Sequence, residues 1–148
     1  MPGMVRRQIQ AVAAGICIAV IIQESIWIAL DLLNPADSLN QALADAPLSD
    51  GWLVPLLLAW LLGGAFGGLM ATLVGGSRYS GHAAGALLSA SAVLLAWISL
   101  PDAGAFLAVA ATPSIGATIG TGLGLNVDDA GRGQPVSPSV VTLACCDR

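Results

Sequence analysis

The chain has 148 residues, of which 56% are hydrophobic and only 9% are charged, and its formal net charge is −4 at pH 7. An ordinary soluble domain carries about 25% charged residues, so this composition excludes a soluble globular protein and indicates a polytopic membrane protein. The few basic residues are all arginine and are outnumbered by nine acidic ones. They offer no basic surface for a run of phosphates, which excludes nucleic acid as a main partner.

Four apolar stretches reach the length of about 20 residues that a helix needs to cross a bilayer. They cover residues of about 9–33, 52–74, 82–100 and 103–125. The first stops at Asn34-Pro35, because the residue before a proline is disfavoured in helical conformation. Only a few residues separate the third stretch from the fourth, which predicts a tight antiparallel hairpin. We therefore expect an all-α fold, an up-down bundle of four transmembrane helices over residues 1–127.

The first stretch also has features of a signal peptide. Arg6 and Arg7 precede it, and Ala42-Leu43-Ala44 looks like a cleavage site. The apolar run is too long for a signal peptide, however, and the candidate cleavage site lies too far beyond its end. An uncleaved signal anchor is the favoured interpretation.

The arginines predict the orientation, because basic residues near helix ends are retained on the cytoplasmic side. They occur before the first stretch, between the second and third, and after the fourth, at Arg6, Arg7, Arg78, Arg132 and Arg148. Both termini are therefore expected in the cytoplasm. The lysine-free composition, rich in alanine, glycine and arginine, suggests a bacterial cell, and hence its inner membrane.

The last 21 residues, 128–148, are rich in glycine, proline, serine and aspartate, and we predict a disordered cytoplasmic tail there. The chain has three cysteines. Cys145 and Cys146 are adjacent in the tail, and Cys17 lies in the first stretch, where we expect an inert core thiol. No C-x-x-C spacing and no cluster of metal-ligand residue types occurs. The sequence therefore predicts no cofactor and no metal site.

Small residues recur at a spacing of four in three of the four stretches. Without a hydrophobic force between helices in lipid, such residues promote association by allowing close backbone approach. The glycines concerned are Gly63, Gly64, Gly67, Gly68, Gly81, Gly85, Gly116 and Gly120. Packing within one chain is the favoured interpretation of these glycines, and homodimerisation is the alternative.

Glu24 is the only ionisable side chain well inside the predicted hydrocarbon region. A charged, unpaired carboxylate there costs several kcal/mol, so we expect it to face the bundle interior, neutral or hydrogen-bonded. Counting residues from the helix centres places Trp60, Thr112 and Ser114 at or near its level. Pro113 leaves a backbone carbonyl in the preceding turn without its helical partner, and that carbonyl is a further possible acceptor.

Two interpretations of Glu24 remain open. In the first, a neutral, hydrogen-bonded carboxyl fixes the helix register, as buried polar residues do in some coiled coils. In the second, Glu24 binds and releases a proton or cation in a small coupled transporter, which requires water and a cavity that reach the carboxyl. The structural interpretation is favoured. An enzyme is not expected, because no nucleophile, base and acid share one depth.

Residues 10–125 resemble an abundant class of small, four-helix bacterial membrane proteins with no assigned activity. The matching features are Glu24, Asn34-Pro35, the run from Ala59 to Ala71, Pro101, and Pro113 with Gly116. The resemblance implies architecture only. The helix count, the glutamate in the first helix and the glycine-rich faces are also similar to small multidrug resistance exporters, although no motif matches residue by residue. From these observations we expect a small integral membrane protein with a structural or accessory role, associating with the lipid bilayer and with a membrane partner or a second copy. The alternative is a proton-coupled transporter using Glu24.

Overall fold

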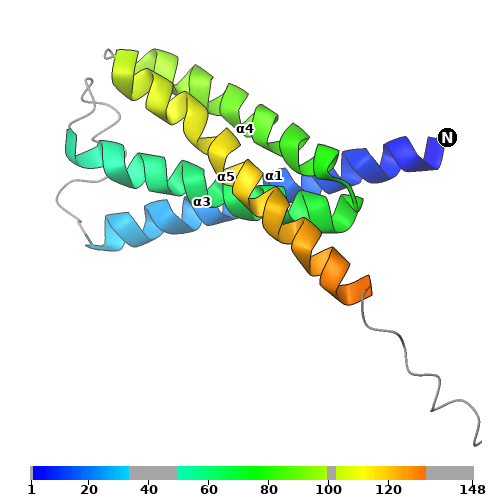
Figure 1. Cartoon of the computed structure of the whole chain (residues 1–148). Coiled ribbons are helices and arrows are strands. Elements are labelled where there is room, and N and C mark those ends of the chain that lie inside the picture. The colour runs from blue at the N-terminus through cyan, green and yellow to red at the C-terminus, as the bar shows by residue number, and fades with distance from the viewer. Residues whose placement is uncertain (1, 34–49, 100–102, 133–148) are drawn as a thin grey trace, which may run out of the picture.

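The computed structural model describes residues 2–33, 50–99 and 103–132, and all of them except a short turn are helical (Figure 1). The helices are α1 (Pro2–Leu33), α3 (Asp50–Gly75), α4 (Arg78–Ser99) and α5 (Ala103–Arg132). All four are long and apolar enough to cross a membrane. The predicted all-α fold with four such helices is therefore confirmed, and the chain has the character of a multi-pass membrane protein.

Two helices extend beyond the apolar stretches that predict them. α1 begins at Pro2 instead of about residue 9, because proline is well suited to a first helical turn and no second proline interrupts the helix. α5 continues to Arg132, so the predicted boundary of the tail at residue 128 is wrong. Asp128 and Asp129 end the apolar run without interrupting the backbone hydrogen bonds. The remainder of the predicted tail, 133–148, and the candidate cleavage site lie outside the described residues.

A two-residue turn joins α3 to α4. Gly76 has a φ of +64°, a left-handed conformation that favours glycine at the end of a helix. Its backbone N–H donates to the carbonyl of Thr72 over 2.8 Å. Ser77 then caps α4, its hydroxyl oxygen accepting a hydrogen bond from the backbone N–H of Tyr79 over 3.2 Å. This turn makes α3 and α4 antiparallel neighbours.

α3 packs against each of the other three helices, whereas α1 packs mainly on α3 and to a smaller extent on α4. Gly15 of α1 contacts Gly67 and Ala71 of α3, and Ala19 contacts Gly63, so α1 and α3 run in opposite directions. Within the described part of α1 only Ala11, Gly15 and Ala19 are buried. α1 therefore packs against the rest of the bundle through one narrow stripe of small residues.

The closest packing joins α3 to α5. A Cβ atom built on Gly116 would meet the backbone of Leu61 and lie 2.9 Å from the backbone nitrogen of Ala65. A Cβ atom on Gly120 would overlap the backbone carbonyl of Ala65 and lie 2.9 Å from the backbone nitrogen of Leu69. Real Cβ atoms do not approach backbone this closely, so the contact requires glycine at both positions.

Glycines on the facing helices extend this contact. Gly64 and Gly68 of α3 lie against the backbones of Pro113 and Ala117 in α5, and a Cβ atom on Gly68 would lie 2.6 Å from the carbonyl oxygen of Ala117. Gly85 of α4 lies against the side chain of Ala117. All eight glycines named from the sequence are buried, and each of them faces another helix of the same chain.

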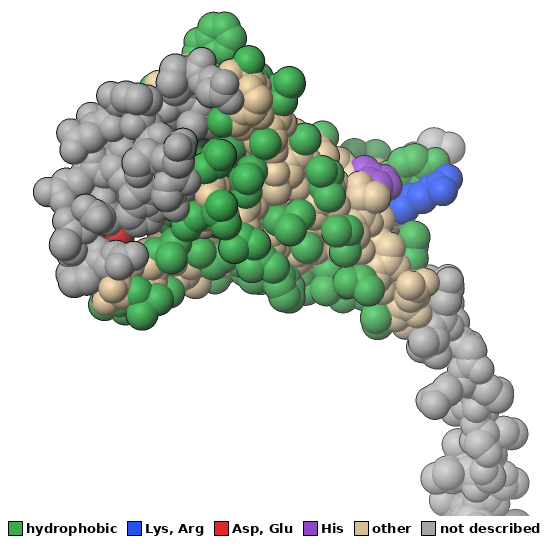
Figure 2. All heavy atoms as spheres, turned by 60° about the vertical axis from the view of Figure 1, so that its left-hand side comes forward, with side chains coloured by type: hydrophobic (Ala, Val, Ile, Leu, Met, Phe, Trp, Pro, Cys, Tyr) green, Lys and Arg blue, Asp and Glu red, His purple; other side chains and the backbone are tan. Residues whose placement is uncertain are grey.

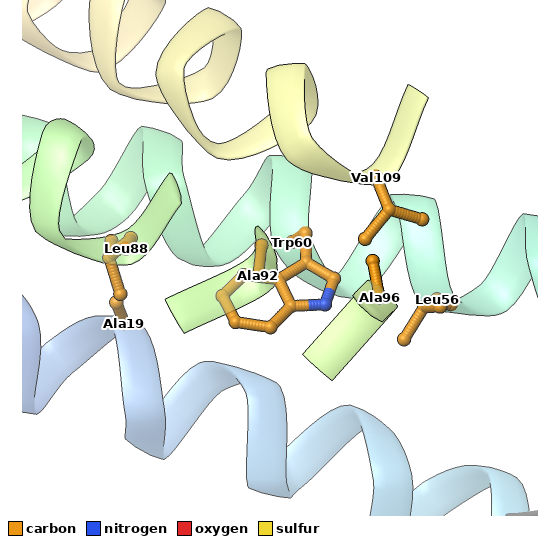
Figure 3. Packing of buried hydrophobic residues seen from close by; sticks show 7 residues of the cluster. All are labelled: Ala19, Leu56, Trp60, Leu88, Ala92, Ala96 and Val109. Atoms are coloured by element: carbon orange, nitrogen blue, oxygen red, sulfur yellow. The ribbon is translucent and has the colours of Figure 1, made fainter. Parts of the chain in front are cut away.

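The other half of the bundle is filled by larger side chains around Trp60, which is 8% exposed. Figure 3 shows its indole ring lying across the middle of a buried cluster to which all four helices contribute. The cluster comprises Ala19, Leu56, Trp60, Leu88, Ala92, Ala96 and Val109. Trp27 and Phe106, which are themselves partly buried, pack against this cluster. One half of the bundle is thus held by close backbone contact and the other by side-chain volume.

We predict that Gly120→Ala destabilises the bundle whereas Gly122→Ala does not. A methyl group at Gly120 meets the backbone of α3, while one at Gly122 has nothing within 4 Å. Overpacking of this kind costs about 1–3 kcal/mol, and alanine at an open helical site gains about 1 kcal/mol over glycine. Thermal unfolding of both purified variants in one detergent measures the difference. Equal midpoints for the two variants would contradict the close packing of α3 on α5.

Candidate functional site

Glu24 lies on the outer surface of α1 and not in the bundle interior, so the sequence-based expectation for its direction is wrong. Its side chain is exposed. It makes no hydrogen bond or ion pair with any residue of the described helices, whereas the next residue, Ser25, donates to the carbonyl of Ile21 over 2.7 Å. The carboxyl group therefore faces the surroundings of the bundle and not another helix.

The neighbouring residue, Gln23, is the one that points inward. Its Cγ atom lies 3.1 Å from the Cβ position of Gly63, and its Nε2 atom is buried with no hydrogen-bond partner among the described residues. Ala11, Gly15, Ala19 and Gln23 follow one another at intervals of four and form the stripe that contacts α3. Because each residue of a helix is turned by about 100° from the last, Glu24 is turned by about 140–180° from Ala11, Gly15 and Ala19 and must face outward.

The other residues named with Glu24 do not assemble around it. Trp60 is in the buried cluster, while Thr112 donates its hydroxyl to the carbonyl of Ala108 in its own helix over 2.5 Å. Ser114 shares a hydrogen bond of 2.7 Å with Ser89, which joins α5 to α4. Trp60, Thr112 and Ser114 therefore each contact other residues and not the carboxyl of Glu24.

A group of buried hydroxyls that the sequence analysis did not single out lies where α3, α4 and α5 meet. Thr72, Ser80 and Thr121 are each 2% exposed. Thr72 donates to the carbonyl of Gly68 over 2.8 Å, whereas the hydroxyls of Ser80 and Thr121 have no partner in the described part of the chain. Small polar residues facing glycine on a neighbouring helix were the available signal, because only such a site leaves room for a buried hydroxyl.

An open groove of about 490 Å³ lies between the first half of α1 and the first half of α4. Its lining is mostly apolar, and it comprises Gln8, Ile9, Val12, Ala13, Ile16, Tyr79, Ser80, Ala83 and Leu87. Glu24 does not line it, so this groove does not bring water or a ligand to that carboxyl. Within the described helices no group of three His, Cys, Asp or Glu residues is placed to hold a metal ion.

Cys17 corrects a second expectation. The free thiol is exposed on α1, not buried in the core. It shares with Val20, Ile21, Glu24 and Ile28 a surface that we call the outer face of α1, and all five side chains are exposed. This face is apolar apart from one carboxyl group, and no other helix of the described chain covers it.

Comparison of the chain with protein-family models, with curated proteins and with solved structures found no match.

Substitution by tryptophan at two adjacent positions should distinguish the inward from the outward face of α1. Gln23→Trp places an indole against Gly63 and should lower the free energy of unfolding by about 1–3 kcal/mol. Glu24→Trp places it on the outer face and should change that free energy by less than about 0.5 kcal/mol. Chemical unfolding of both variants in detergent provides the measurement, and a larger loss for Glu24→Trp would reverse the orientation of α1.

Proposed function

We propose that this chain is a small integral membrane protein of a bacterial inner membrane, with a structural or accessory role exercised through the outer face of α1. It associates through that face with another membrane protein or with a second copy of itself. The proposal rests on the exposed carboxyl of Glu24, which lies in the C-terminal half of the apolar helix α1. Membership of the class of small four-helix bacterial membrane proteins that the sequence resembles is part of the same proposal.

The orientation of the proposed protein rests on its arginines. The guanidinium Nε of Arg7 donates to the carbonyl of Val74 over 3.2 Å, so the start of α1 lies beside the end of α3. Arg78 begins α4 at the same end of the bundle. Figure 2 displays arginine and histidine side chains gathered at one end of a largely hydrophobic surface. The preference for basic residues on the cytoplasmic side supports cytoplasmic termini.

The cost of exposing Glu24 to lipid supports association. Glu24 lies nine residues before the end of α1 at Leu33, about 13.5 Å along the helix axis, and inside the candidate span Gly3–Leu33. Ionisable side chains at that depth are rare and almost always face a protein interior or a water-filled cavity. Since neither is provided within the described helices, a partner that buries or hydrogen-bonds this carboxyl would remove the cost.

The glycine-rich faces support the same choice of surface by elimination. Gly64, Gly68, Gly116 and Gly120 are buried against helices of the same chain. They are therefore occupied, and homodimerisation through them would require the bundle to separate. The outer face of α1 has no such competing contact in the described helices.

A photoreactive amino acid at Ile28 tests the proposal in cells. Ile28 is 60% exposed on the outer face of α1, and Ile119, which is 52% exposed on α5, is the matched control. We expect a crosslinked adduct from Ile28 and none from Ile119. An adduct of twice the chain mass identifies self-association, and any other mass identifies a different partner.

Substitution of Glu24 completes the crosslinking test. Glu24→Leu should abolish the adduct at Ile28 while leaving the thermal stability of the isolated chain unchanged or raised, because leucine is favourable on a lipid-facing surface. Glu24→Gln, whose side chain can still form hydrogen bonds, should preserve most of the adduct at Ile28. An adduct at Ile28 no stronger than the control, or one that persists in Glu24→Leu, contradicts the proposal.

The transporter alternative makes a different prediction. A coupled transporter releases protons from Glu24 when a cationic substrate binds, so release from the detergent-purified chain should depend on the compound and disappear in Glu24→Gln. We expect no release from the folded native chain when a panel of cationic compounds is added at several pH values. Compound-dependent release that is absent in Glu24→Gln would replace the accessory role with transport.

A further inference from the structure

The groove between α1 and α4 has an apolar wall and a basic mouth. Its wall includes Ile9, Val12 and Ile16 from α1, and Ala83 and Leu87 from α4. Its volume of about 490 Å³ lies within the range of about 300–1,000 Å³ that ligand pockets occupy. An occupant that fits this wall is an alkyl chain, because the walls offer contact area and few hydrogen-bonding groups.

The groove lies near the end of the bundle where Arg7 and Arg78 lie, and its end nearest Tyr79 is what we call its mouth. Gln8 and Tyr79 line it nearest that end, and the guanidinium carbon of Arg78 lies 5.5 Å from the centroid of the Tyr79 ring. Arg6 and Arg7 immediately precede Gln8 on α1, but the guanidinium of Arg7 is turned toward the carbonyl of Val74 in α3. Arg78 is therefore the guanidinium beside the groove. From the interior outward, the apolar wall is therefore followed by the ring of Tyr79 and then by the guanidinium of Arg78.

Positive charge at this mouth is not neutralised by the elements that form the groove. Arg78 lies in the first turn of α4, where the helix dipole is already positive, and that turn contains no acidic residue. α1 has no acidic residue before Glu24. Asp128 and Asp129, at the same end of the bundle, belong to α5, which does not line the groove. An anion at the mouth would relieve the unfavourable placement of Arg78.

We propose that this groove binds one acyl chain of an anionic phospholipid, with its phosphate held near Arg78. A guanidinium group and the N-terminus of a helix both favour phosphate. The phospholipid satisfies the apolar wall and the basic mouth together, whereas inorganic phosphate satisfies only the mouth. This inference requires membrane insertion but is independent of any association through the outer face of α1.

Lipid titration of the full-length chain in mild detergent, followed by native mass spectrometry, tests the proposal. The probes are phosphatidylglycerol and phosphatidylcholine with identical acyl chains. We expect one tightly bound phosphatidylglycerol, bound about fivefold or more tightly than phosphatidylcholine, which corresponds to about one basic contact with an anionic headgroup. Excess inorganic phosphate should not displace it.

Two pairs of variants separate the headgroup contact from the acyl chain contact. Arg78→Gln should remove the preference for phosphatidylglycerol, while Arg132→Gln, which deletes the same charge from α5, should retain it. Ala83→Trp fills the groove and should weaken the binding of both lipids. Ala111→Trp, on the exposed surface of α5, should weaken the binding of neither.

Three outcomes would overturn the proposal. They are equal affinity for the two lipids in the native chain, equal effects of Arg78→Gln and Arg132→Gln, and displacement of the lipid by inorganic phosphate. Arg78 is exposed, so its replacement leaves the packing intact and keeps the headgroup test valid even if Ala83→Trp does not fold. Loss of the crosslink at Ile28 with normal lipid binding would reject the accessory role and leave this proposal standing.

Discussion

The contact between the backbones of α3 and α5 determines the arrangement of the other helices. Gly116 and Gly120 bring α5 so close to α3 that a single methyl group would overlap its carbonyl groups. At this separation dispersion and polar contacts between backbones replace the hydrophobic force that is absent between helices in lipid. α4 then packs against both members of the pair, and α1 is attached to the opposite side of α3.

This unequal distribution of contacts explains why the candidate site lies on α1. A helix with three buried residues in its described part presents most of its circumference outward. The small residues of α3, α4 and α5 pack against one another, so the glycine-rich faces of these helices are buried. A carboxyl group on those glycine-rich faces would compete with packing, whereas on the outer face of α1 it costs the isolated chain no internal contact.

Hydropathy and glycine spacing were sufficient to predict the four helices, because a span is recognised from its own length and composition. They could not predict which side of α1 faces α3, because that depends on the neighbour. Glu24 was expected inside on the argument that a carboxyl avoids lipid, yet Gln23 occupies the inward position. The stripe of Ala11, Gly15 and Ala19 carried the necessary information, since at about 100° per residue it places Glu24 about 140–180° away from the contact. The end of α5 was missed for a different reason, because the apolar run ends before the helical hydrogen bonding does.

The helices of the bundle are markedly unequal in length. At 1.5 Å per residue, the 22 residues of α4 extend about 33 Å, while the 32 residues of α1 extend about 48 Å. The hydrocarbon layer of a typical bilayer is about 30 Å thick. In the membrane-inserted chain that we propose, α4 would match that thickness and set the depth of the whole bundle, and the longer helices would tilt or project into the aqueous phase. In a thicker bilayer α4 is the helix that becomes too short, which would sort this chain toward membranes of ordinary or smaller thickness.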